Sequence, residues 1–184
     1  MNDDILLKNK RSIALTVLIL ISIHLIWNYY HGGVPTHYIL HDKSLPGFSN
    51  WWGLLAIPVM TWGLITLAQK KSPKNSTALP NSRLKESEVL KGFIGSFIFG
   101  LINSLFWEFG YEHILQYLIL LPVVLSLFIT IHRPENVLGF LLGMTFTFGG
   151  VLPLGFSLIL WVMSYIVNKG LRKGAITLIN ILRN

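Results

Sequence analysis

Residues 12–30 read SIALTVLILISIHLIWNYY, and this stretch decides the class of fold. It holds no charged side chain, and its apolar run is interrupted by Ser22, His24 and Asn28. A helix needs about 20 mostly apolar residues to cross the hydrocarbon core of a bilayer. Large aromatic residues and a histidine follow it, in place of the small residues of a signal-peptide cleavage site. We therefore predict a transmembrane helix over 12–30 that is retained as a membrane anchor.

The whole chain has the composition of a membrane protein. Of its 184 residues, 52% are hydrophobic and 12% are charged, and mean hydropathy is +0.58. Soluble domains carry about 25% charged residues, so this composition excludes a disordered chain and an ordinary soluble enzyme. Because the chain has no cysteine, disulfide bonds and thiolate metal sites are excluded as well.

Further apolar stretches of spanning length follow the first one. The tract 134–168 would extend about 50 Å as one helix, which is too long for a single crossing. Gly149, Gly150 and Pro153 interrupt this tract, and such residues break or turn a helix. We therefore expect an all-α polytopic membrane protein, a bundle of six transmembrane helices with a short fifth span. The predicted spans are 12–30, 51–69, 91–108, 113–131, 134–149 and 151–168.

Two patterns in the second half of the chain predict further packing. Gly139 and Gly143 form a small-xxx-small pair, which lets the fifth span approach a neighbouring helix closely. After the membrane domain, 1–168, the tail 169–184 places apolar residues at helical spacing beside basic ones. This pattern is typical of an amphipathic helix that lies on the cytoplasmic surface of the membrane, and a helix docked under the bundle is the alternative.

The basic residues agree with the six-span topology. If both termini lie on one side of the membrane, every one of the 15 Lys and Arg residues except Lys43 falls on that side. Basic residues concentrate in cytoplasmic loops, so we expect both termini in the cytoplasm, below a bacterial inner membrane. The same rule accounts for the net charge of +7 without a nucleic-acid partner.

This topology places most of the metal-ligating side chains at the outer end of the bundle. Only His132 of the six histidines falls at the inner end. Three carboxylates share the outer end with the other five histidines. The residues of this cluster are His24, His31, His37, His41, His113, Asp42, Glu108 and Glu112.

Spacing brings several of these residues onto shared helix faces. His24, Asn28 and His31 are separated by four and three residues, which puts them on one side of the first span. If residues 35–42 are helical, His37 and His41 share a face at the i, i+4 spacing of a two-histidine metal site. Ser104 and Glu108 share a face of the third span by the same rule.

Imidazoles and carboxylates together suit a divalent metal, and zinc fits them best. We expect His31, His37, His41 and His113 as ligands, with Asp42, Glu108 and Glu112 as catalytic acids or bases. His24, Asn28 and Ser104 would orient the site from below. These residues predict a metal-dependent membrane enzyme, a hydrolase acting on a membrane lipid or small amphiphilic substrate at the outer face.

Other functions fit the same residues. The cluster could begin the pathway of a small transporter or proton-coupled carrier, although few polar residues continue inward. His24 and His113 could be axial ligands of a haem. The histidines could also sense pH in a non-catalytic assembly protein. Each residue taken alone has a structural alternative, as a side chain that faces water or, for His24, as a neutral imidazole bonded to Asn28 or to a backbone carbonyl.

Overall fold

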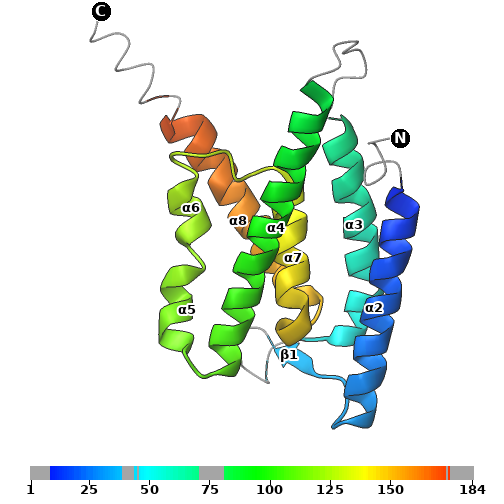
Figure 1. The fold of residues 1–184 in the computed structure, drawn as a ribbon. Coiled ribbons are helices and arrows are strands. Elements are labelled where there is room, and N and C mark those ends of the chain that lie inside the picture. Colours follow the sequence, from blue (N-terminus) through cyan, green and yellow to red (C-terminus); the bar gives the residue numbers. More distant parts are fainter. Residues whose placement is uncertain (1–8, 39–43, 45, 71–80, 173, 175–184) are drawn as a thin grey trace, which may run out of the picture.

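The computed structural model describes residues 9–38, 44, 46–70, 81–172 and 174, and this part of the chain is mostly helical (Figure 1). Within it, four helices are long and apolar enough to cross a membrane. They are α2 (Lys10–Tyr30), α3 (Gly53–Lys70), α4 (Asn81–Glu108) and α8 (Val151–Ile166). A 3-10 turn, η2 (Asn50–Trp52), precedes α3, and a π-helix, η3 (Val167–Arg172), continues α8.

When η2 is counted with α3 and η3 with α8, the four apolar helical stretches contain 20 to 22 residues, about 30 Å of helix. They are Lys10–Tyr30, Asn50–Gln69, Ser87–Glu108 and Val151–Leu171. Inside a bilayer a helix satisfies its own backbone hydrogen bonds, so long apolar segments fold this way. The first, second, third and sixth predicted spans are thus confirmed as helices of spanning length. The predicted C-terminal amphipathic helix, 169–184, lies mostly outside the described residues.

The outward faces of these helices are apolar. On α2, Leu15, Ile19 and Ile23 follow one another at helical spacing, and each exposes more than half of its surface. A soluble monomer rarely leaves so large an apolar surface in water, whereas lipid covers it without cost. Helix length and this surface together indicate an integral membrane protein.

The predicted fourth span, 113–131, is not one continuous helix, so this prediction is wrong. It is divided into α5 (Glu112–Leu118) and α6 (Leu121–Leu125), and the chain from 126 to 133 is not helical. Pro122 accounts for the break, because proline has no N–H to donate to the preceding turn and its ring clashes with that turn.

The helix α7 (Pro134–Phe148) lies at the centre of the bundle. With 15 residues it is about 22 Å long, shorter than the roughly 30 Å hydrocarbon core. It contacts α3, α4 and α8, and Figure 1 shows it behind α4. Its bounds agree with the predicted fifth span, and it is enclosed by the longer helices.

Glycines allow α7 and α4 to approach closely. A Cβ atom added at Gly139 would overlap the carbonyl oxygen of Phe93 on α4. One added at Gly143 would overlap the carbonyl oxygen of Phe97 and lie 3.0 Å from the Cα of Gly100. The close packing predicted from the two α7 glycines is confirmed, and α4 is the neighbour.

The buried apolar side chains are centred on α7. Phe140 and Met144 pack with Leu115 of α5 and Leu160 of α8. On another side of α7, Leu138 packs in a cluster with side chains of α3.

Candidate functional site

Those predicted site residues that the structure describes gather at one end of the bundle. α2 and α4 end there, α5 begins there, and strand β1 (Thr36–Tyr38) lies beside them, at the lower end in Figure 1. We call this the histidine-rich end, and the opposite end, with His132, the basic end. His41 and Asp42 lie outside the described residues.

His24 and Asn28 form a hydrogen-bonded pair on α2. The amide Nδ2 of Asn28 lies 3.1 Å from Nε2 of His24. Since an amide nitrogen only donates, the imidazole accepts at Nε2. The shared helix face predicted from their spacing is confirmed. Because Nε2 of His24 accepts this hydrogen bond, it is occupied by Asn28. This favours a role in supporting the site from below over a role as a metal ligand.

His31 ends α2 with its ring held in a defined orientation. Its Nδ1 lies 2.9 Å from the carbonyl oxygen of Trp27, and the two rings stack with centroids 3.9 Å apart. A carbonyl oxygen only accepts, so Nδ1 carries the proton and the lone pair is on Nε2. The side chain is exposed. His31 thus presents a ring nitrogen that can bind a metal ion at the membrane surface.

Residues 36–38, in the loop after α2, form a β-strand and not part of the helix over 35–42 on which the shared face of His37 and His41 depended. Gly32 and Gly33 turn the chain with φ values of 124° and 96°. β1 then pairs antiparallel with β2 (Gly47–Ser49). This pairing gives the backbone of a short segment hydrogen-bond partners that a helix of a few residues would supply poorly.

His37 is the inward-facing residue of this hairpin. It lies opposite Phe48 in the register. Because successive strand side chains point to opposite sides, Thr36 and Tyr38 are exposed while His37 is half-buried. The prediction that His37 and His41 share a helix face is therefore wrong, because His37 lies in a strand. Both residues still belong to the same short loop as His31.

The hairpin loop is anchored on the turn between α7 and α8. Asn50, which is 3% exposed, contacts Gly149, and Gly53 at the start of α3 contacts Gly150. Gly149 has φ +69° and ψ −153°, a conformation open almost only to glycine. The predicted division of the tract 134–168 at these glycines is confirmed, and the turn supports the loop that carries His31 and His37.

Replacing Gly149 with alanine should destabilise the folded protein by about 2 kcal/mol or more. Such a backbone conformation costs about 1–3 kcal/mol for another residue, and the added Cβ would overlap Asn50. Thermal unfolding in detergent checks this. Gly155→Ala is the matched control, since a Cβ there meets no atom within 4 Å. Equal unfolding temperatures for the two variants would contradict this account of the turn.

The remaining predicted residues lie across the bundle from α2. Glu108, Glu112 and His113 are exposed around the turn from α4 to α5, which passes through Gly110 at φ +75°. Figure 1 shows α5 and α2 at opposite sides, with α4 and α7 between them. His113 contacts the ring of Tyr111, with centroids 6.2 Å apart. The structure therefore does not bring His113 to His24, as a shared haem would need.

Among the described residues, no group of three or more His, Asp or Glu side chains is placed to hold a metal ion. The predicted cluster is divided into a loop group, with His31 and His37, and an α4–α5 group with His113. Ser104, predicted beside Glu108, is 3% exposed, and its Oγ donates to the carbonyl oxygen of Gly143 at 3.3 Å. It joins α4 to α7 and does not face the histidine-rich surface.

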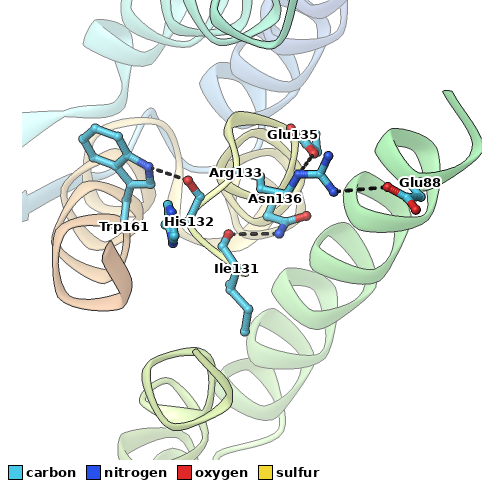
Figure 2. Close-up of polar contacts among 7 residues, drawn as sticks. All are labelled: Glu88, Ile131, His132, Arg133, Glu135, Asn136 and Trp161. Atoms are coloured by element: carbon cyan, nitrogen blue, oxygen red, sulfur yellow. Dashed lines mark hydrogen bonds and ion pairs between the residues drawn. The ribbon is translucent and has the colours of Figure 1, made fainter. Parts of the chain in front are cut away.

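Sequence reasoning did not assign a role to a polar cluster at the basic end (Figure 2). Glu135 is 6% exposed, and its Oε1 lies 2.8 Å from Nε of Arg133. The same guanidinium reaches Oε2 of Glu88 on α4, at 3.8 Å from Nη1. The sequence did contain a signal for this cluster. Glu135 stands at the start of an apolar tract, directly after Arg133 and Pro134, and a charged side chain in such a place has to be paired.

The same cluster satisfies the non-helical backbone before α7. Nδ2 of Asn136 donates to the carbonyl oxygen of Ile131 at 2.9 Å. Nε1 of Trp161 on α8 donates to the backbone carbonyl oxygen of His132 at 3.1 Å, as Figure 2 shows. The His132 ring meets Tyr165 edge to face. These contacts fasten α4, α7 and α8 together, which is a structural role.

The chain matches no family model, no curated protein and no solved structure with which it was compared. The loop group is the described set whose chemistry suits a ligand, because its His31 is exposed with an oriented ring and its His37, six residues later in the chain, is half-buried.

Proposed function

We propose that the protein is an integral membrane enzyme that uses a divalent metal ion, zinc first, to hydrolyse a lipid or small amphiphilic substrate at the histidine-rich end. We place the metal in the loop after α2, with ligands drawn from His31, His37, His41 and Asp42. The basic end, with Lys10, Lys91 and Arg133, would face the cytoplasm of a bacterial inner membrane.

The orientation of His31 carries this proposal. Metal-binding histidines almost always donate their second ring nitrogen to a carboxylate, backbone carbonyl or water, which fixes the ring and its tautomer. His31 has this arrangement through Trp27, with the lone pair on the exposed side chain's Nε2. His37 follows in the same loop.

Zinc chemistry accounts for the other residues of this end. A catalytic zinc takes three protein ligands and lowers the pKa of its bound water to about 7. The fourth candidate of the loop would act as general base, because Glu108 and Glu112 lie with His113 at the turn from α4 to α5. The His24–Asn28 pair would orient the site from below. His113 is left out of the ligand set because α4 and α7 separate it from the loop.

The surroundings favour a substrate that comes from the membrane. Trp27, Tyr29 and Tyr30 all lie at the end of α2 and expose more than half of their surface. Aromatic rings of this kind lie at the level of lipid headgroups. An amphiphile held at that level would reach His31 without leaving the bilayer.

Metal analysis of the purified protein tests the proposal. We expect about one zinc per chain in the wild type, since the four candidate ligands of the loop suffice for a single catalytic zinc with three protein ligands. His31→Ala and His37→Ala should each lower the metal content at least tenfold. His113→Ala is the matched control and should retain the metal. Hydrolysis of lipids in phosphatidylethanolamine–phosphatidylglycerol vesicles should stop on addition of a chelator.

A wild-type protein purified without metal, and unaffected by chelator, would overturn the metal-dependent function. Loss of metal in His113→Ala as large as in His31→Ala would overturn the placement in the loop. It would show instead that ligands from both sides of the bundle meet.

A further inference from the structure

A small cavity with a partly polar lining lies inside the bundle, between α4, α6, α7 and α8. Its volume is about 40 Å³. A cavity needs about 10–15 Å³ to admit one water molecule, so this one has room for up to about three. The polar part of its lining consists of Ser96 of α4, Asn136 of α7, and Ser157 and Ser164 of α8. The cavity therefore offers hydroxyl and amide groups to a small polar ligand.

Two of these polar groups follow one face of α8. Ser157, Leu160, Trp161 and Ser164 all line the cavity. Their i, i+3, i+4, i+7 spacing puts them on the same side of the helix. The two serines are two turns apart, about 10 Å along the helix axis. One water molecule cannot contact both hydroxyls, so a ligand that reaches both has to extend along α8.

The hydroxyl of Ser164 lacks the hydrogen bond that other hydroxyls in these helices make. Oγ of Ser22 and Oγ1 of Thr145 each donate to the carbonyl oxygen four residues earlier, at 2.8 and 2.7 Å. Ser164 is 1% exposed, and its Oγ has no hydrogen-bond partner among the residues that the structure describes. Buried polar side chains nearly always have a partner in the protein or in ordered water. The cavity beside Ser164 leaves room for such a water.

We propose that this cavity binds a short chain of two or three ordered water molecules, anchored on the hydroxyl of Ser164. Water offers this hydroxyl both a donor and an acceptor, and the chain would continue along the cavity toward Ser96 and Ser157. Oγ of Ser157 donates to the carbonyl oxygen of Leu154 at 3.0 Å, so it can still accept a proton from water. A lipid acyl chain in this space would leave the hydroxyl of Ser164 unsatisfied.

Radiolytic hydroxyl-radical footprinting of the full chain in detergent tests the proposal, because radicals formed from a bound water oxidise the side chains beside it. Phe140 lines the cavity and is 6% exposed. Phe148 is the matched control. It also lies on α7, packs in the same apolar cluster and is 8% exposed, but it does not line the cavity. We expect Phe140 to be oxidised at least fivefold faster than Phe148, and equal rates would overturn the proposal.

Two serine variants test whether the water is held at Ser164. Ser164→Val replaces the hydroxyl with methyl groups and should lower the oxidation rate of Phe140 to that of Phe148. Ser22→Val is the matched control, because Oγ of Ser22 bonds to its own helix α2, and Phe140 should be oxidised in it as in the wild type. An unchanged rate for Phe140 in Ser164→Val would overturn the proposal, since it would show that radicals reach the ring from bulk solvent.

The comparison of the two phenylalanines in the wild type needs no substitution, so the proposal stays testable if Ser164→Val does not fold. The water site is separate from the proposed metal loop and does not depend on it. Zinc content should be the same in both serine variants as in the wild type, so failure of the water site is distinguishable from failure of the metal site.

Discussion

Replacing Gly143 with valine should remove most of the folded protein, with a loss of about 3 kcal/mol or more in stability. A side chain at this position has to enter the backbone of α4, because even a Cβ would overlap the carbonyl oxygen of Phe97. Overpacking of a core costs about 1–3 kcal/mol when side chains can move aside, and here the obstacle is main chain. The yield of monodisperse protein and its thermal unfolding in detergent measure the effect.

Gly95→Val is the matched control for this prediction. Gly95 also lies within a helix, α4, but a Cβ there meets no atom within 4 Å. It therefore carries the propensity cost of a β-branched residue without the overlap. If both valine variants unfold at the same temperature, close contact between α4 and α7 does not hold the bundle together.

Removal of the Arg133 guanidinium should have the second large effect. Arg133→Met leaves the Glu135 carboxylate buried without its 2.8 Å partner. Breaking a buried ion pair from one side costs about 3–5 kcal/mol, whereas replacing both partners by apolar residues is often neutral. Because the Arg133 side chain is 34% exposed, we expect a loss at the lower end of this range. The double variant Arg133→Met with Glu135→Leu should therefore recover most of the lost stability in thermal unfolding.

Glu88→Gln controls for the exposed half of the same network. Its oxygen lies 3.8 Å from Arg133 and its side chain is 65% exposed, so we expect a change of at most about 1 kcal/mol. A double variant as unstable as Arg133→Met alone would show that the ion pair is not the source of the effect.

The long helices could be predicted from the sequence because length and hydropathy decide them locally. Residues 12–30 are helical in any membrane environment, and the structure begins α2 two residues earlier. The segment 113–131 passes the same hydropathy test, yet Pro122 interrupts it. Its last part turns back to pair with residues outside it, as when Asn168 Nδ2 donates to the carbonyl oxygen of Ser126 at 2.8 Å. Periodicity within a segment carries no information on such a partner.

In the candidate site too, features that depend on local spacing could be predicted, and features that depend on distant partners could not. The helix face that His24 shares with Asn28 depends on helical spacing alone and was predicted. The fold around His37 depends on pairing with Phe48, eleven residues away in the chain, and spacing alone indicated a helix. The separation of His113 from the loop depends on which helices pack side by side. The distribution of basic residues predicts on which side of the membrane a loop lies, but not which helices are neighbours.

The shortness of α7 has a consequence for how the chain enters the bilayer during synthesis. A 15-residue helix is too short for both of its ends to reach the headgroups, so we expect it to insert poorly on its own. The Gly149–Gly150 turn joins α7 to a helix that can span the membrane, so the two should insert as one hairpin, against an α4 already in place. A nascent chain arrested before α8 is made would hold α7 outside the lipid, and the last third of the protein would assemble in a single late step.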